Sequence, residues 1–182
     1  MQITKTKFEG LYILEPKIWG DDRGYFFESY SQQTLAEAGI DIVFVQDNEA
    51  MSTKGVLRGL HYQVGHTAQS KLVRVSKGEV LDVAVDIRPQ SQTYGQHISV
   101  ILSDRNKKQM LIPKGFAHGY VVLSDTAVFQ YKCDQFYDRE AEGGILYSDA
   151  QLCIDWILDS EQYTVSDKDK VQPLFGNHKP YV

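Results

Sequence analysis

A histidine stands in the middle of a strand-like run, Val56-Leu-Arg-Gly-Leu-His61-Tyr-Gln63. Side chains of a strand alternate between two faces, so His61 and Gln63 are expected on one face and Arg58 on the other. An imidazole can take up or release a proton near pH 7, which makes His61 a candidate for acid-base chemistry. The alternative is a structural histidine in the core or at a dimer contact, which is the more frequent case for a lone strand histidine.

Lys71 and Asp82 lie in two further strand-like runs on either side of the dipeptide Lys77-Gly78. This dipeptide predicts a tight hairpin turn that pairs Val73 with Asp82. In that register Lys71 and Asp82 are diagonal neighbours on one face of the hairpin. We therefore expect an ion pair between them inside the barrel, in which Asp82 keeps the lysine protonated.

Short strand-like runs that alternate with turn residues must position these side chains. Regular short strands of this kind indicate an antiparallel sandwich or barrel, that is, an all-β fold. The predicted strands cover residues 11–19, 25–30, 42–48, 56–63, 71–76, 79–87, 97–102, 108–112, 119–124 and 127–133.

Signals for helices are few. Ser31 can cap a short helix that runs to Ala38 and is closed by Gly39, and Ser166 can begin a single helical turn. The tail from about residue 150 is less regular than the rest. Because no linker, repeat or low-complexity segment interrupts the chain, we expect a single domain over residues 1–182.

Composition and charge narrow the possible classes of protein. The 182 residues are 42% hydrophobic and 24% charged, as in ordinary globular domains. The net charge of -5 offers no basic face for a nucleic-acid polymer, although local arginines and lysines can still hold a small anion. No apolar run approaches the roughly 20 residues of a transmembrane helix, so no membrane contact is expected. The only cysteines, Cys133 and Cys153, lack metal-site spacing and fit reduced thiols in a cytoplasm.

The run Pro113-Lys-Gly115-Phe-Ala-His118-Gly119 has the Pro-x-Gly-x-x-His form of the second half of the cupin motif. The chain thus resembles the cupin superfamily, whose fold is a double-stranded β-helix, or jelly-roll barrel. Metal-binding cupins also supply His-x-His and a following Glu, because a divalent ion needs several converging ligands. Here the corresponding residues are His61-Tyr-Gln63 with no Glu at the usual distance, so we expect no bound metal.

A closer resemblance rests on seven segments that span most of the chain. They are similar to segments of the dTDP-4-dehydrorhamnose 3,5-epimerase family and occur in the family's order. These segments are Asp22-Arg-Gly-Tyr-Phe-Phe-Glu28, Phe44-Val-Gln-Asp-Asn48, Val56 to Gln63, Lys71-Leu-Val-Arg-Val75, Asp82-Val-Ala-Val-Asp86, Pro113 to Gly119 and Tyr131-Lys-Cys133. The resemblance implies a cytoplasmic homodimer that, without a cofactor, epimerises C3 and C5 of a dTDP-linked 4-ketosugar, giving dTDP-4-dehydro-L-rhamnose from dTDP-4-dehydro-6-deoxy-D-glucose.

Such a reaction needs a base, a cation at the ketone oxygen and an acid on the opposite face of the sugar. The resemblance assigns the base to His61, supported by Asp169, although spacing alone does not choose Asp169 over Asp167. It assigns the enolate oxygen to Lys71, for which a purely structural ion pair is an equal alternative. The acid is Tyr131, whose alternative is an ordinary core tyrosine.

The resemblance also implies a set of side chains that bind the nucleotide: cations for the diphosphate, polar groups and an aromatic ring that stacks on thymine, Tyr137. The implied binding residues are Arg23, Phe26, Glu28, Gln46, Asp47, Asn48, Arg58, His118, Tyr137, Glu142 and Lys168.

One of these assignments conflicts with strand alternation. Arg58 and His61 have opposite parity and cannot both face one cavity from a regular strand. A β-bulge at Gly59 would remove the conflict, and we therefore expect one there.

Three alternative functions remain open from the sequence. A related enzyme that epimerises only one carbon, or acts on another dTDP-ketosugar, would use the same side chains. A non-catalytic nucleotide-sugar-binding cupin would need no base, lysine and phenol together. A metal-dependent cupin oxygenase would hold its ion with His61 and His118.

Overall fold

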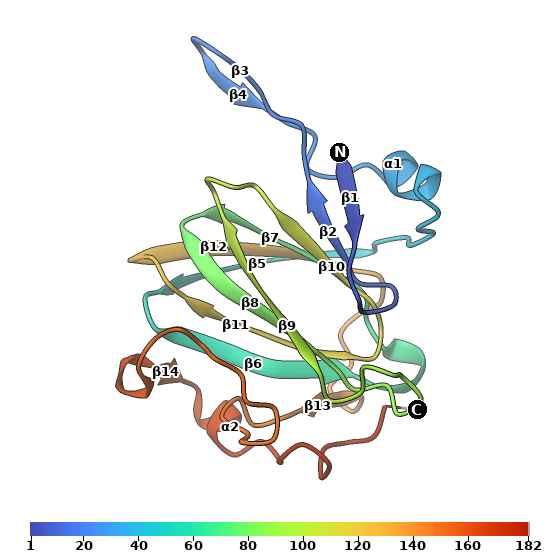
Figure 1. The fold of residues 1–182 in the computed structure, drawn as a ribbon, viewed down its shortest axis with the longest axis vertical. Helices are drawn as coiled ribbons and strands as arrows, with labels where there is room; N and C mark the ends of the chain where they lie inside the picture. The colour runs from blue at the N-terminus through green and yellow to red at the C-terminus, as the bar shows by residue number, and fades with distance from the viewer. Residues whose placement is uncertain (182) are drawn as a thin grey trace.

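The computed structural model describes residues 1–181, which form two antiparallel sheets packed face to face (Figure 1). This architecture, with only short helices, confirms the all-β fold that the strand spacing predicted and the jelly-roll barrel that the resemblance implied. The first sheet runs in the order β1 (Gln2–Lys5), β2 (Tyr12–Glu15), β10 (Gln109–Ile112), β7 (Lys71–Lys77), β12 (Thr126–Cys133) and β5 (Gln46–Thr53).

The second sheet holds the strand of His61. It runs in the order β13 (Glu142–Gly144), β6 (Val56–Gln63), β11 (Phe116–Val122), β8 (Glu79–Asp86) and β9 (His97–Ser103). The short strand β14 (Thr164–Val165) pairs with β6 in parallel orientation.

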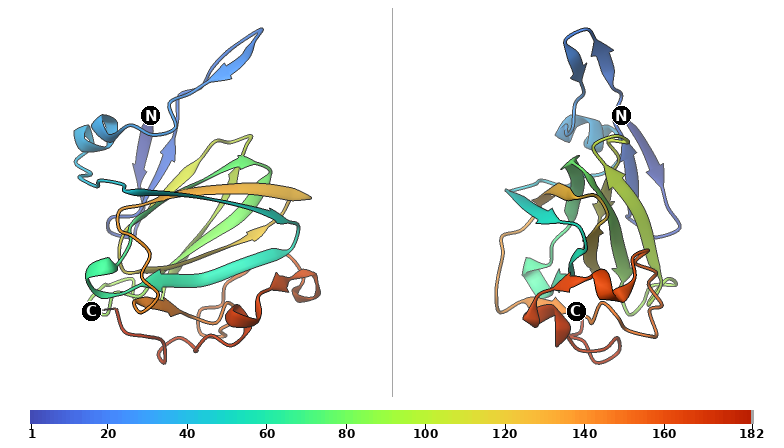
Figure 2. Two further views of the ribbon diagram at one scale, coloured as in Figure 1. Left: turned by 180° about the vertical axis from the view of Figure 1, so that it is seen from behind. Right: turned by 90° about the vertical axis from the view of Figure 1, so that its left-hand side faces the viewer.

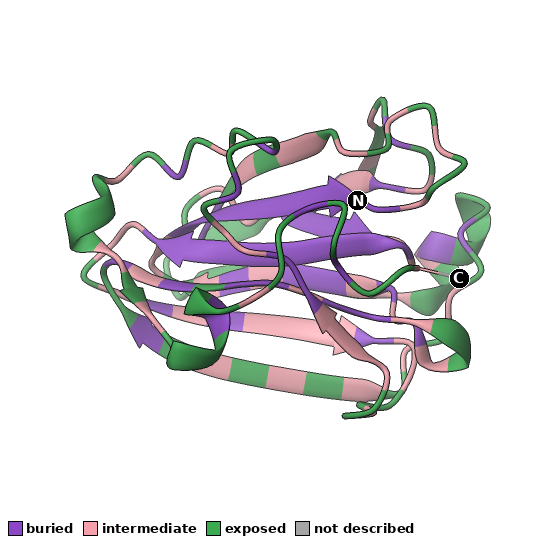
Figure 3. Ribbon diagram, turned by 90° about the horizontal axis from the view of Figure 1, so that it is seen from below, coloured by how far each residue is buried: buried purple, intermediate pink, exposed green. Residues whose placement is uncertain are grey.

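The main core fills the space between the sheets. It contains Val73 and Phe129 from the first sheet and Ala84 and Val122 from the second. A second cluster covers the outer face of the second sheet, where the C-terminal segment supplies Trp156 and other apolar side chains. Strand β8 is therefore buried on both faces, which explains why its sequence is apolar almost throughout. Figure 3 shows the buried residues gathered on the central strands.

Two helices were predicted and both are present. Helix α1 (Gln32–Glu37) begins at Ser31, whose side chain accepts a hydrogen bond from the Thr34 amide, and Gly39 follows it with φ of 78°. Helix α2 (Asp167–Lys170) begins at Ser166 in the same manner. Single 3₁₀ turns lie at Gly65–Thr67 and Ser160–Gln162. No helix among residues 1–181 is long and apolar enough to cross a membrane.

The predicted hairpin at Lys77-Gly78 is wrong in its pairing. A turn does occur there, and Gly78 adopts a φ of 78°. The turn passes the chain from one sheet to the other, so β7 pairs with β10 and β12 while β8 pairs with β9 and β11. The sequence signal was one of a turn between two strands, and it carries no information on whether those strands pair with each other.

The strand bounds near the N-terminus also differ from the prediction. Residues 42–45 form no ladder, although Ile42 and Phe44 pack on the cluster beneath α1 while Val43 and Val45 are exposed. This extended segment alternates like a strand, and its backbone reaches β12 at Val45, whose amide donates to the Cys133 carbonyl at 2.9 Å. Strands β1, β13 and β14, of two to four residues, were not predicted.

A separate hairpin extends away from the two sheets (Figures 1 and 2). It consists of β3 (Trp19–Asp21) and β4 (Gly24–Phe26), joined by the predicted turn at residues 21–24. Phe26 is 70% exposed and Tyr25 is 61% exposed, so this hairpin presents aromatic rings to its surroundings.

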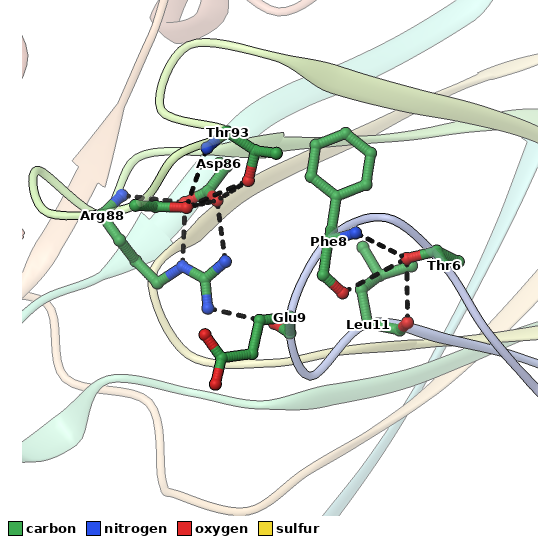
Figure 4. A network of polar contacts seen from close by, with 8 residues as sticks. Thr6, Phe8, Glu9, Leu11, Asp86, Arg88 and Thr93 are labelled. Carbon is green, nitrogen blue, oxygen red and sulfur yellow. Dashed lines mark hydrogen bonds and ion pairs between the residues drawn. The ribbon is translucent and has the colours of Figure 1, made fainter.

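A buried carboxylate anchors the loop that follows β8 (Figure 4). Asp86 accepts hydrogen bonds from the Arg88 guanidinium at 2.7 and 2.9 Å and from the hydroxyls of Ser91 and Thr93 at 2.6 Å each. Arg88 also donates to the carbonyl of Glu9, which ties the N-terminal loop to the same centre. Burial opposes the ionisation of Asp86, but these donors outweigh it and lower its pKa.

Candidate active site

A cavity of about 550 Å³ opens between the two sheets. Strands of both sheets line it, and the C-terminal segment closes one side. The lining residues are Ala50, Val56, Leu57, Arg58, His61, Lys71, His118, Gly119, Tyr120, Phe129, Tyr131, Thr164, Val165, Ser166, Lys168 and Asp169. All four predicted catalytic residues are therefore brought together in one place.

The predicted bulge at Gly59 is present. On β6 two residues, Gly59 and Leu60, lie between His61 and Arg58, while a single residue, Gly119, lies between their partners on β11. Gly59 has a φ of 131°, and a Cβ there would approach the Cα of Gly119 to 2.6 Å. The extra residue reverses the alternation, so that Arg58 and His61 both face the cavity.

The imidazole of His61 is hydrogen bonded to the carboxylate of Asp169, with 2.6 Å between Nε2 and Oδ1. Asp169 is buried, whereas the His61 side chain keeps 30% of its surface exposed. Burial opposes the ionisation of Asp169, but the bond to His61, the Gly59 amide and Ser166 together hold its pKa below the ordinary value. The carboxylate therefore stays charged beside the imidazole and can stabilise its protonated form.

Lys71 reaches the cavity from β7 of the opposite sheet. Burial lowers its pKa, while the carboxylates of Asp82 and Glu142 act against that change. Its ammonium group lies 5.9 Å from the centre of the Tyr131 ring.

The predicted ion pair between Lys71 and Asp82 is not formed: among the described residues no contact within 4.0 Å joins the two groups. Asp82 is fully buried, and its carboxylate lies 2.9 Å from Nε2 of His118 instead. The reason is the sheet change at Gly78, which removes the diagonal register on which the ion pair depended. Asp82 still acts on Lys71 through charge, at longer range.

Tyr131 lies on β12 and faces the cavity with Phe129. Burial raises the pKa of its hydroxyl, so the phenol keeps its proton at neutral pH. Because β12 belongs to the first sheet and β6 to the second, Tyr131 and His61 approach the cavity from opposite walls.

Three predicted binding residues form a cluster beside His61. Glu142 accepts a hydrogen bond from Lys168 at 2.6 Å and one from the Tyr137 hydroxyl at 3.1 Å. Burial opposes ionisation of Glu142, but these two donors lower its pKa. Lys168 lines the cavity, and Tyr137 is 57% exposed next to it, so a flat ring has room to stack there.

The other predicted binding residues do not line the cavity. Arg23 and Phe26 lie on the projecting hairpin, and Glu28 follows it near α1, where it accepts a hydrogen bond from Thr34. Asp47 pairs with Lys132 on the outer face of the first sheet.

Two binding residues on β5 lie closer to the chemistry. Gln46 donates a hydrogen bond to Asn48, and Asn48 contacts the thiol of Cys133, the register partner of Lys71. Both amides therefore belong to the inner face of the first sheet.

Gln63, which replaces a metal-ligating histidine of other cupins, is engaged in the fold. It donates to the carbonyls of Thr67 and Phe136 and accepts from the Asp138 amide. Within residues 1–181 no group of three or more His, Cys, Asp or Glu side chains is arranged to hold a metal ion.

Sequence reasoning missed Tyr120, a cavity residue of β11. The available signal was its position two residues after His118, which places both side chains on one strand face. The predicted helix start at Ser166 is present: its hydroxyl accepts a hydrogen bond from the Asp169 amide.

Comparison with known proteins agrees with this geometry. The family model for dTDP-4-dehydrorhamnose 3,5-epimerase matches residues 5–177. The curated epimerase of that name from Salmonella typhimurium is 52% identical over 96% of this chain and 95% of its own.

Solved structures give the same result. The epimerase of Elizabethkingia anophelis is 47% identical, with a TM-score of 0.93 over 97% of both chains. The dTDP-6-deoxy-D-glucose-3,5-epimerase of Legionella pneumophila, solved with dTDP-4-keto-L-rhamnose, is 53% identical, with a TM-score of 0.92 over 97% of this chain and 93% of its own. The chain accordingly belongs to the dTDP-4-dehydrorhamnose 3,5-epimerase family and is an isomerase.

Proposed function

We propose that the protein converts dTDP-4-dehydro-6-deoxy-D-glucose into dTDP-4-dehydro-L-rhamnose by exchanging protons at C3 and C5 without a cofactor. The observation that carries this proposal is the meeting of a His61–Asp169 pair, a lysine and a phenol in one cavity. A proton on carbon beside a ketone becomes acidic only when the enolate is stabilised, and these side chains supply each requirement.

His61 acts as the base in this scheme. Its imidazole removes the proton from the carbon next to the ketone, and the negative charge of Asp169 stabilises the imidazolium that results. General-base catalysis of this kind contributes ~10²- to 10⁴-fold in rate.

Lys71 holds the enolate oxygen. An ammonium group in a partly desolvated cavity stabilises a developing negative charge more strongly than it would in water. The carboxylates of Asp82 and Glu142 act against the effect of burial and favour the protonated form that this role needs.

Tyr131 acts as the acid. Since it approaches from the wall opposite His61, a sugar ring between them meets the base on one face and the proton donor on the other. Delivery of a proton to the face opposite the one that lost it inverts the carbon. The His61 imidazolium then releases its proton to solvent and the Tyr131 phenolate takes one up, after which a second cycle at the other carbon completes the epimerisation.

The dTDP moiety is bound by the positive and polar groups around the cavity. Arg58, His118 and Lys168, which line the cavity, bind the negative charge of the diphosphate. Tyr137 stacks on thymine beside Glu142. Gln46 and Asn48 lie on the inner face of β5.

We further propose a homodimer. Arg23 and Phe26 are binding residues in our assignment, yet the hairpin carries them away from the cavity of their own chain. A second copy that receives this hairpin would unite them with a cavity and cover its exposed aromatic rings. We also propose that the enzyme acts in the cytoplasm, where reducing conditions keep thiols such as those of Cys133 and Cys153 free.

The proposal is tested by incubating the protein with the 4-ketosugar in deuterated water. Deuterium at both C3 and C5 is expected, with dTDP-4-dehydro-L-rhamnose as the product. Label at one carbon only would show a single-carbon epimerase. A protein that binds dTDP but incorporates no deuterium into the ketosugar would be a non-catalytic binding protein.

A further inference from the structure

The hydroxyl of Tyr120 is buried without a hydrogen-bond partner among residues 1–181. The residue as a whole is 5% exposed and packs in the main core. A buried hydroxyl without a partner costs about 1 to 3 kcal/mol, so native proteins rarely keep one unless something else uses it. Phenylalanine would fill the same space without this cost.

Packing against Phe129 fixes the position of the Tyr120 ring. It stacks on Phe129 with 4.1 Å between the ring centres and an angle of 15° between the planes. Tyr120 lines the cavity, so its orphan hydroxyl belongs to the site that receives the substrate. Packing therefore holds this polar group in one orientation before any ligand arrives.

The neighbours of Tyr120 indicate which part of a ligand it meets. Tyr120 is the register partner of Arg58 on β6, and both side chains line the cavity. Ser52 accepts hydrogen bonds from Nε and one terminal nitrogen of the Arg58 guanidinium, at 3.3 and 3.2 Å, which fixes the arginine beside the tyrosine.

Tyr120 and Arg58 can both donate a hydrogen bond to a ligand in the cavity. Burial raises the pKa of Tyr120, and although Arg58 and Ser52 act against this, the net change keeps the phenol protonated. Two converging donors require an acceptor between them, and an anionic phosphate oxygen, which only accepts, satisfies both.

We propose that the Tyr120 hydroxyl donates a hydrogen bond to the diphosphate of the bound nucleotide sugar, next to Arg58. This inference rests on the proposed function, because it requires a nucleoside diphosphate in the cavity. It makes Tyr120 a binding residue that positions the sugar through the diphosphate, with no part in proton transfer.

The test compares Tyr120→Phe with Tyr62→Phe as a matched control. Tyr62 is 3% exposed, and its hydroxyl donates to the Lys179 carbonyl at 2.6 Å, outside the cavity lining. Calorimetric titration with dTDP is expected to show about tenfold weaker binding by Tyr120→Phe and unchanged binding by Tyr62→Phe. Thermal unfolding is expected to show the reverse, with a lower Tm for Tyr62→Phe and an equal or higher Tm for Tyr120→Phe.

Further measurements separate the possible failures. Unchanged dTDP affinity of Tyr120→Phe would overturn the inference, as would weaker binding of the ketosugar without weaker binding of dTDP, which would place the hydroxyl on the sugar. A lower Tm of Tyr120→Phe would also overturn it by revealing an internal partner. Failure of the wild-type protein to bind dTDP or to exchange protons would instead contradict the proposed function itself.

Discussion

Nε2 of His61 and Oδ1 of Asp169 lie 2.6 Å apart although 108 residues separate them along the chain. The pairing of β14 with β6 and the Ser166 cap of α2 bring the two together. Sequence spacing alone would allow Asp167 the same role. Its side chain, however, is fully exposed and pairs with Lys170. The local helix geometry therefore selects one of two neighbouring carboxylates.

Asp169→Asn is expected to lower kcat by ~100-fold or more, because the amide cannot stabilise an imidazolium with a negative charge. Deuterium incorporation at C3 and C5 measures the loss. Asp167→Asn, in the same helix, is the control and should retain wild-type rates. Equal effects of the two substitutions would contradict the assignment of Asp169.

Lys71 is expected to set an alkaline limit on activity. Since burial lowers its pKa, the ammonium group is lost at a pH below the ordinary lysine range, and kcat should fall as pH rises through that lowered pKa. Asp82→Asn removes a charge that raises the lysine pKa, so the alkaline limb should move to lower pH. The measurement is a profile of kcat against pH, with Asp41→Asn, an exposed carboxylate outside the cavity lining, as the control. An alkaline limb of Asp82→Asn at the wild-type pH would contradict this idea.

Gly59→Ala is expected to destabilise the fold by about 3 kcal/mol, because the residue has a positive φ and a Cβ would collide with the backbone of β11. Gly39→Ala is the matched control: its φ is also positive, but a Cβ meets nothing within 4 Å. That substitution should cost about 1 kcal/mol. Urea unfolding of both variants measures the difference, and equal losses would mean that the close approach of the strands has no energetic weight.

Asp86→Asn is expected to cost about 3 kcal/mol, because a buried carboxylate bonded to Arg88 is replaced by a neutral amide. The pKa of Asp86 is lowered in the folded state, so its contribution is present above about pH 4 and is lost as pH falls through the folded pKa. Urea midpoints of the wild type and the variant should therefore converge in acid. A difference between the two urea midpoints that stays constant with pH would show that the shape of the Asp86 side chain, and not its charge, holds the loop.

The bulge at Gly59 was predicted correctly from strand alternation together with the site roles that the family resemblance implied for Arg58 and His61. Strand alternation and the demand that Arg58 and His61 share a cavity required one extra residue, and glycine is the residue that tolerates the backbone angle found there. The helix caps at Ser31 and Ser166 were equally readable, since capping depends on side chains within four residues.

Long-range pairing was harder to predict. The partners of β7 are β10 and β12, which lie far along the chain, and no local rule distinguishes them from the adjacent β8. For the same reason the partner of Asp82 proved to be His118 and not Lys71. Tyr120 escaped notice because its role depends on the absence of a partner, which only the packed structure reveals.

Because β14 pairs with β6 in parallel orientation, catalysis depends on whether the C-terminal segment is docked on the second sheet. The two sheets close without Asp169, whereas the His61–Asp169 pair exists only while the segment around α2 is docked. Local release of that segment would leave the strand content, and hence the circular dichroism of the sheets, almost unchanged while removing the base's partner. Proton exchange is thus a sensitive reporter of tail docking that bulk spectroscopy would overlook.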